Sequence, residues 1–249
     1  MPIISIVLLF AAFFAAGVMN AIAGGGSFLT FPALLLSGLD PRAANITSTL
    51  ALFPMQVSTG YAGRDMAKGT PRLSFRALFI ISFIGGVVGA ILLLMTPPAF
   101  FARLVPWLIL FATALFAYGS FYKKPSELNA DQHLGIFGSM LTQFGISIYG
   151  GYFGGGIGFL MLAALTLAGM NIRKAGATKN ILAAVMNAAA VFIFLFSHDI
   201  GWIQVGIGAV ASIAGGMLGV KILHLVNERI LRIVVVVIGS ALTIAMFAY

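Results

Sequence analysis

The stretch GGGSFL at residues 24–29 returns as GGGIGFL at residues 154–160, with one residue inserted. Beyond that insertion the two halves of the chain keep a constant offset of 131 through rarer residue types. The matched pairs are Phe28 with Phe159, Arg42 with Arg173, Thr47 with Thr178, and Met55 with Met186. Chance matches between small residues are common in a chain with 30 glycines, but matches through Arg, Thr and Met are not. The pattern predicts a duplicated unit.

The composition places both units in a membrane. Of 249 residues 61% are hydrophobic and 8% are charged, and the mean hydropathy is +1.08. Soluble domains are nearer 45–50% apolar and about a quarter charged. This excludes a soluble globular domain, and it also excludes a disordered chain.

A helix needs about 20 apolar residues to cross the hydrocarbon core. Eight runs are near that length: 3–23, 43–63, 74–95, 100–121, 134–152, 176–197, 200–220 and 230–248. Two more apolar runs, 27–38 and 157–169, are too short to cross comfortably, and each follows a glycine triplet. The first run has no basic n-region, so we interpret it as a retained helix rather than a signal peptide.

The distribution of Lys and Arg predicts which side each loop faces. If each short run returns the chain to the side where the preceding helix began, twelve basic residues share one side. The other side then holds only Arg42 and Arg103. Without that reversal the split is eight against six. Because cytoplasmic loops are rich in Lys and Arg, we expect both termini outside. The loops at 64–73, 122–133, 170–175 and 221–229 are then cytoplasmic.

Each unit therefore contains five segments, an odd number, so the second unit enters the membrane in the opposite orientation. We predict an all-α polytopic membrane protein of two inverted repeats, residues 1–125 and 126–249, which together form one membrane domain. Each repeat carries a short broken helix. In transporters built this way the solute site lies near the midplane, where short segments interrupted by Gly occupy matching positions in the two halves.

The glycine triplets offer a specific chemistry. Glycine lets the backbone turn tightly and approach a ligand closely. The first N–H groups of the helix that follows have no intrahelical partner, and the helix dipole makes that end electropositive. Two such ends facing one pocket would favour a small oxyanion. The alternative is that these glycines only permit close packing of membrane helices.

The predicted substrate-binding residues comprise both triplets and the polar residues near them. They are Gly24, Gly25, Gly26, Ser27, Gly154, Gly155, Gly156, Thr47, Gln56, Thr178, Asn180 and Asn187. Gln56 and Asn187 each follow a matched Met, which favours a place along the pathway, although buried amides can also join helices. Arg42, Arg173 and Lys179 are candidates for attracting anions, and for Arg173 an ordinary interface role is the stronger interpretation.

Other chemistries lack the residues that they need. There is no cysteine, and no metal or other cofactor is expected. The Asp and Glu residues all fall in loops or at helix ends, whereas proton relays usually place a carboxylate within a helix. An intramembrane serine protease using Ser27 would need a nearby His, but each His lies at a membrane edge. The basic loops account for the net charge of +8 without nucleic acid.

The pattern resembles the sulfite exporter TauE/SafE family, also called the toluene sulfonate uptake permease family. The resemblance rests on the first triplet, the short helix with Phe31-Pro32 and the stretch AANITS at residues 43–48. In the second half it rests on the second triplet and AGATKN at residues 175–180. It implies movement of small sulfur-containing anions across the bacterial inner membrane. One departure is that Ser27 follows the first triplet, whereas Ile157-Gly158 follows the second.

We therefore predict a secondary transporter or permease for a small anion such as a sulfur oxyanion or organosulfonate. It would work by alternating access in the inner membrane, and it would not be an enzyme. Its partners would be the anionic solute and the lipid bilayer, with no nucleic acid, and a homo-oligomer is left open. The alternatives are a transporter of another anion such as a carboxylate, or a non-transporting scaffold subunit. The sequence does not distinguish import from export.

Overall fold

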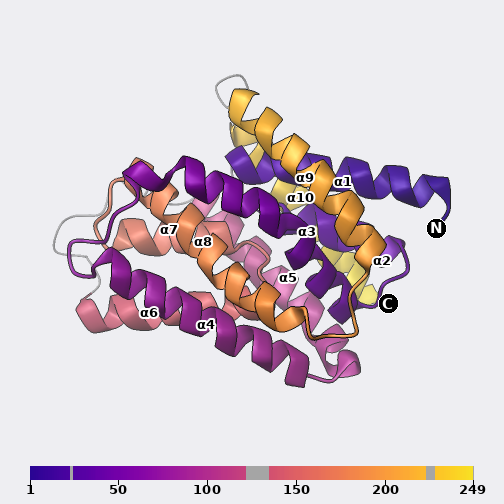
Figure 1. Cartoon of the computed structure of the whole chain (residues 1–249), viewed down its shortest axis with the longest axis horizontal. Helices are drawn as coiled ribbons and strands as arrows, with labels where there is room; N and C mark the ends of the chain where they lie inside the picture. Colours follow the sequence, from indigo (N-terminus) through magenta and orange to yellow (C-terminus); the bar gives the residue numbers. More distant parts are fainter. Residues whose placement is uncertain (23–24, 122–134, 223–227, 249) are drawn as a thin grey trace.

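The computed structural model describes residues 1–22, 25–121, 135–222 and 228–248, and all regular structure within them is helical. The helices lie side by side along the long axis of the molecule (Figure 1). They are α1 (Ile3–Ile22), α2 (Ser27–Leu36), α3 (Pro41–Ala62), α4 (Phe75–Met95), α5 (Pro98–Phe121), α6 (Ile136–Tyr152), α7 (Ile157–Leu167), α8 (Ile172–Phe194), α9 (Trp202–Ile222) and α10 (Glu228–Ala248). A short 3₁₀ turn, Arg64–Met66, follows α3. The prediction of an all-helical membrane fold is confirmed.

Within the described residues, five helices are long and apolar enough to cross a membrane. These spans are Ile3–Ala21, Phe75–Met95, Pro98–Tyr118, Arg173–Phe194 and Trp202–Gly219. The sequence predicted eight crossing runs, and each of them forms a helix. The helix α3 is not among the five spans. It carries Asn, Thr, Ser and Gln side chains, and half of its residues are buried inside the bundle.

Both glycine triplets interrupt the chain between helices, as predicted. The helix α1 ends at Ile22 and α2 begins at Ser27, while α6 ends at Tyr152 and α7 begins at Ile157. The short helices α2 and α7 then extend towards opposite ends of the bundle (Figure 1). Each therefore starts in the interior of the bundle, where a full-length helix would continue across.

The turns that follow the two short helices are also matched. Gly38 and Gly169, at the offset of 131, both have left-handed backbone, with φ of +96° and +92°. Two residues after each glycine, a polar side chain caps the next long helix. Asp40 accepts a hydrogen bond from the Arg42 amide at 2.9 Å, and Asn171 accepts one from the Arg173 amide at 3.0 Å. Such caps satisfy helix-terminal N–H groups that otherwise have no partner.

The helices α3 and α8 pack against each other at the centre of the bundle. Asn187 donates its side-chain amide to Gln56 Oε1 at 2.6 Å, and these two residues are themselves partners at the offset of 131. Further along α3, Gly60 lies against Asn180 and Ala184, and Gly63 lies against Ala177. Residue numbers rise on α3 as they fall on α8, so the two helices are antiparallel. This pairing is compatible with an inverted repeat.

A second repeat, which the sequence analysis missed, explains the closest helix contacts. The stretch SFIGGVVG at residues 82–89 in α4 returns as SIAGGMLG at residues 212–219 in α9. Its glycines let α4 approach the backbone of α6, and they let α9 approach the backbone of α1. A Cβ atom on Gly219 would lie 2.8 Å from the Val18 carbonyl oxygen, and one on Gly89 would overlap the Ile148 carbonyl oxygen. Small residues that let membrane helices approach in this way are a common packing device.

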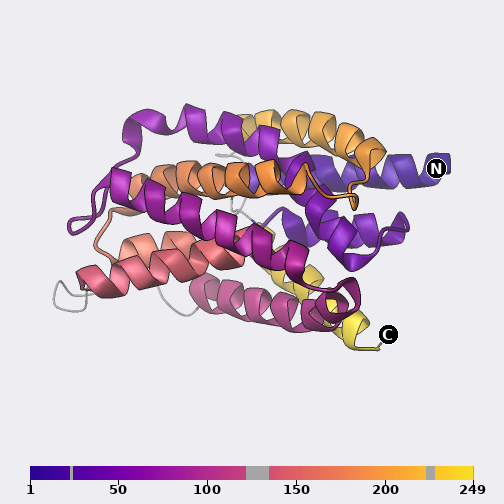
Figure 2. The ribbon, with the colours of Figure 1, turned by 60° about the horizontal axis from the view of Figure 1, so that its bottom comes forward.

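The same repeat meets the matched methionines. Gly86 in α4 lies against Met186 in α8, and Gly216 in α9 lies against Met55 in α3. Figure 2 shows α5 and α10, which also pack against each other, on the side of the bundle away from α3 and α9. The helix pairing is thus the same in both halves, which is compatible with the predicted repeats. The predicted boundary between residues 125 and 126 lies outside the described residues.

Candidate functional site

The first glycine tract turns the chain from α1 into α2. Gly25 has a φ of +86°, a left-handed conformation that favours glycine. The Gly26 amide donates to Asn20 Oδ1 at 3.4 Å, and a Cβ atom on Gly26 would lie 2.8 Å from the Ala16 carbonyl oxygen. Ser27 is then the first residue of α2. The predicted site residue Gly24 lies outside the described residues.

The second tract uses two left-handed glycines, Gly154 with a φ of +76° and Gly156 with a φ of +71°. The Tyr149 hydroxyl donates to the Gly155 carbonyl oxygen at 2.9 Å. This bond occupies an oxygen that would otherwise repel an anion. Among the described residues, no hydrogen bond satisfies the amides of Gly155, Gly156 and Gly158. The tract therefore leaves backbone donors at the start of α7 without a partner in the described part of the chain.

Neither short helix has a side-chain cap at its N-terminus. The helices α3, α4 and α8 are capped by Asp40, Ser74 and Asn171. A helix start without a cap leaves N–H groups without an intrahelical partner and keeps the positive end of the helix dipole unneutralised. At the start of α7 the amides of Gly155, Gly156 and Gly158 keep this donor capacity. In α2, by contrast, the amides of Phe28, Leu29 and Thr30 donate to the Gly25 and Gly26 carbonyl oxygens, so that α2 contributes mainly its dipole.

One cavity brings the two tracts together. It is lined by Ser27 at the start of α2 and by Gly155 ahead of α7, with two further polar residues, Asn45 and Ser48, from α3. The remaining walls are apolar and are formed by Phe28, Phe31, Ile109, Phe153 and Leu242. The free space is about that of a single water molecule. A polyatomic anion would enter only if some of these side chains moved.

The polar wall on α3 was not predicted as part of the site. Asn45 is buried and donates its side-chain amide to the Tyr152 carbonyl oxygen at 3.0 Å. The hydroxyls of Ser48 and Thr30 are 2.6 Å apart. Both cavity residues belong to the stretch AANITS that indicated the family resemblance, so the signal was present. The sequence analysis chose Thr47 from that stretch, but on a helix Thr47 faces a different direction from Asn45 and Ser48.

Aromatic rings close the space between the two tracts. Phe28 lies 3.4 Å from the position of a Cβ atom on Gly25 and 3.5 Å from that of a Cβ atom on Gly156. Its matched partner Phe159 and Phe28 itself both contact Phe116 of α5, with ring centroids 3.8 Å and 6.4 Å away. The tracts therefore share an apolar wall, which lowers the local dielectric constant and strengthens any hydrogen bond formed beside it.

The matched threonines do not line this cavity. Thr47 accepts a hydrogen bond from the Gly201 amide at 3.0 Å in the loop before α9. Thr178 accepts one from the Lys68 amide at 3.0 Å and donates to the Lys68 carbonyl at 2.9 Å in the loop before α4. Each therefore anchors the loop that leads into the glycine-rich helix of the other half.

The remaining predicted residues also lie elsewhere. Gln56 and Asn187 bind each other between α3 and α8, and the Asn180 backbone lies against Gly60 in the same interface. Arg173 is exposed, and Lys179 is half-buried on α8. Of the predicted residues that the structure describes, Ser27 and Gly155 line the cavity, and Gly25 and Gly156 lie behind the aromatic wall.

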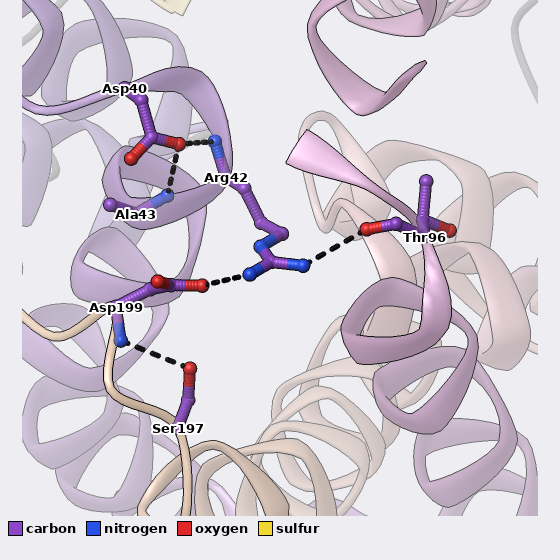
Figure 3. A network of polar contacts seen from close by, with 6 residues as sticks. All are labelled: Asp40, Arg42, Ala43, Thr96, Ser197 and Asp199. Atoms are coloured by element: carbon purple, nitrogen blue, oxygen red, sulfur yellow. Dashed lines mark hydrogen bonds and ion pairs between the residues drawn. The ribbon is translucent and has the colours of Figure 1, made fainter. Parts of the chain in front are cut away.

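Arg42 lies at the end of the bundle that carries both chain termini. It forms an ion pair with Asp199 at 2.5 Å and donates to the Thr96 carbonyl oxygen at 3.0 Å (Figure 3). Asp65 lies in the turn after α3, and Asp40 caps α3. In the part of the chain that the structure describes, no three His, Asp or Glu side chains gather as a metal site.

Comparison with known proteins identifies the relatives of this arrangement. A model of the family described as sulfite exporter TauE/SafE matches residues 9–246. A probable membrane transporter protein of Haemophilus influenzae is 33% identical over 244 residues, which cover 96% of this chain and 93% of that protein. The probable membrane transporter protein ORF9 of Sinorhizobium sp is 32% identical, over 96% and 91% of the two chains. The probable membrane transporter protein YfcA of Escherichia coli K12 is 27% identical, over 97% and 89%. No solved structure matches the chain.

Proposed function

Because this chain belongs to the sulfite exporter TauE/SafE family of membrane transporters, we propose that it carries a small anion, a sulfur oxyanion or organosulfonate, through the cavity between α2 and α7. Its family consists of transporters rather than enzymes. The proposal places the protein in the bacterial inner membrane with both termini outside, as the distribution of Lys and Arg favours.

One observation carries the proposal: Ser27 and Gly155, at the uncapped starts of two broken helices from different halves, line the same cavity. Its polar groups are hydroxyls, one side-chain amide and backbone, with no carboxylate among the lining residues. Neutral donors and two helix dipoles favour an anion without a fixed countercharge. An anion held by such donors can leave again, which transport requires.

The two halves would alternate the access to this cavity. Matched helices meet at the interface of α3 and α8, and such an interface lets one half rock against the other around a fixed site. The free space in the cavity is about that of one water molecule, so we interpret this conformation as one that does not admit the solute. Rocking that separates Phe28 or Phe153 from the opposite wall would admit the solute.

Uptake into proteoliposomes tests the function. We expect purified protein to transport labelled sulfite and methanesulfonate, and a short carboxylate serves as the competing class. Replacing one hydrogen-bond donor to an anion costs about 1.5–3 kcal/mol, or roughly tenfold or more in rate or affinity. Ser27→Ala and Ser48→Ala should each show such a loss.

Two matched variants control for general damage. Ser37→Ala changes the other end of α2, where the hydroxyl bonds only to the Leu34 carbonyl at 2.7 Å. Thr49→Ala is one residue from Ser48, and its hydroxyl bonds to the Asn45 carbonyl in its own helix at 3.0 Å. Both should transport normally. Faster transport of the carboxylate than of either sulfur anion would assign the protein to a different substrate class.

A further inference from the structure

The Arg42 guanidinium connects three segments at one end of the bundle. It extends from the first turn of α3, contacts Asp199 in the loop between α8 and α9, and contacts Thr96 between α4 and α5 (Figure 3). The side chains of Arg42 and Asp199 are 17% and 27% exposed, so the pair lies partly at the surface. We name this pair with the Thr96 contact the Arg42 latch. It joins elements from both halves of the chain.

The guanidinium is not fully satisfied. It has five N–H donors, of which Nη2 meets Asp199 and Nη1 meets the Thr96 carbonyl. The Nε atom is buried and has no hydrogen-bond partner among the described residues. The geometry is therefore that of a bidentate oxyanion receptor in which an internal carboxylate occupies one side.

A chain of contacts leads from the latch to the cavity. The Thr96 hydroxyl accepts a hydrogen bond from the Tyr152 hydroxyl at 3.3 Å, and the Tyr152 carbonyl accepts one from the Asn45 amide at 3.0 Å. Asn45 lines the cavity, and it follows Arg42 by one turn on α3. The latch is thus linked to the wall of the cavity through the Thr96–Tyr152–Asn45 hydrogen bonds.

The matched arginine lacks an equivalent pair among the described residues. Arg173, which matches Arg42 at the offset of 131, is exposed and forms no ion pair within the described residues. Both arginines follow the same cap geometry, so the difference lies in the partner and not in the backbone. Among the described residues, the Arg42 end thus has a partly buried ion pair that the Arg173 position lacks.

We propose that the Arg42 latch is the outer gate of the transport path, and that an anion opens it by replacing the Asp199 carboxylate on the Arg42 guanidinium. This rests on the proposed anion transport. Exchanging one oxyanion for another keeps the guanidinium paired, which avoids the large cost of an unpaired buried charge. Release of Asp199 would loosen the loop between α8 and α9 at this end, while the Thr47 hydroxyl still holds the loop at Gly201.

Binding measurements separate an exchange from a purely structural ion pair. In purified protein titrated with methanesulfonate, Asp199→Asn removes the competitor and should raise the affinity severalfold. Arg42→Gln removes the receptor and should lower the affinity by about tenfold. A structural pair would instead give both variants the same loss, because each breaks the same contact.

Asp40→Asn is the matched control for charge. It removes a carboxylate close to the same guanidinium, yet Asp40 bonds only to the amides of Arg42 and Ala43, and Asn caps helices about as well as Asp. It should leave the affinity unchanged. If Asp40→Asn raised the affinity for methanesulfonate as much as Asp199→Asn, the loss of one negative charge would explain both results. The proposed exchange of carboxylate for anion would then be wrong.

Thiol labelling tests the gate without any transported solute, since the protein has no native cysteine. A Ser27→Cys reporter should react slowly with an impermeant maleimide applied outside intact cells. Adding Asp199→Asn should speed the reaction at least severalfold, the swap Arg42→Asp with Asp199→Arg should slow it again, and Arg173→Gln should leave it unchanged. Equal labelling rates of the Ser27→Cys reporter in all of these variants would contradict the proposed gate. If labelling behaves as expected but no anion binds, the proposed function fails while the gate stands.

Discussion

The two glycine tracts share a backbone device but differ in the chemistry around them. Both break a helix with left-handed glycines, and both lead to a short helix without a side-chain cap. Around the first tract, α3 supplies Asn45 and Ser48 to the cavity. The matched positions on α8 hold Gly176 and Lys179, neither of which lines it.

The difference separates what is duplicated from what is not. The helix breaks, the loop anchors Thr47 and Thr178 and the close contacts of α4 and α9 occur in both halves. The polar wall is built on α3 alone, and among the described residues the Arg42 latch has no counterpart at the matched Arg173. A symmetric scaffold gives two related conformations, whereas an asymmetric set of donors gives one solute site with unlike entrances.

The largest expected effect concerns the duplicated scaffold. Gly89→Ala and Gly219→Ala place a Cβ atom against the backbone of α6 and α1, and overpacking of this kind costs about 1–3 kcal/mol. We expect similar falls in the melting temperature of the detergent-solubilised protein. Gly145→Ala and Gly206→Ala are the controls, because a Cβ atom there meets nothing within 4 Å. A lower melting temperature for only one of these two variants would contradict the equivalence of the two halves.

The next effect concerns the unduplicated wall. Asn45→Ala removes a buried amide from the cavity together with its bond to the Tyr152 carbonyl. Transport of sulfite into proteoliposomes should fall about tenfold, as expected for the loss of a buried polar partner. Gly176→Ala changes the matched position on α8, where a Cβ atom has open space, and should transport normally. Equal losses in both would mean that the two halves contribute alike.

The duplicated scaffold and the unduplicated polar wall differ in how well the sequence predicted them. The composition, the glycine triplets and the distribution of charged residues predicted the helices, the breaks and the short segments, because they reflect the energetics of burying backbone in lipid. The offset of 131 paired Gln56 with Asn187, which do contact each other. It could not show that this contact excludes both from the cavity. Partners such as Asp199 for Arg42 depend on tertiary contacts between distant segments, which local pattern does not encode.

A smaller effect is expected where a side chain positions each tract. Tyr149→Phe removes the hydrogen bond to the Gly155 carbonyl, which measures 2.9 Å, and a net loss of about 1 kcal/mol corresponds to roughly fivefold in affinity. Asn20→Ala removes the longer bond to the Gly26 amide at 3.4 Å and should cost less. Methanesulfonate titration of both variants gives the comparison, with the exposed Tyr61→Phe as the control. A greater loss of affinity in Asn20→Ala than in Tyr149→Phe would mean that the first glycine tract contributes more to binding than the second.

The smallest expected effect concerns the hydrogen bond between Gln56 and Asn187, which joins the two halves. Gln56→Leu with Asn187→Leu, measured against each single variant in a double-mutant cycle, should give a coupling of about 0.6 kcal/mol, typical of hydrogen bonds between membrane helices. Exchanging the residues, Gln56→Asn with Asn187→Gln, should preserve stability, because the two positions are matched. A large loss on exchange, with the single variants stable, would show that the surroundings of the pair are not equivalent.

The most direct test locates the anion itself. Selenite is a heavier analogue of sulfite, and its selenium atom can be located in crystals by anomalous scattering. We expect a single peak in the cavity, within hydrogen-bonding distance of Ser27, Ser48 and the backbone at Gly155. A peak that lies instead beside Lys179 or Arg173, with none between the starts of α2 and α7, would contradict the account.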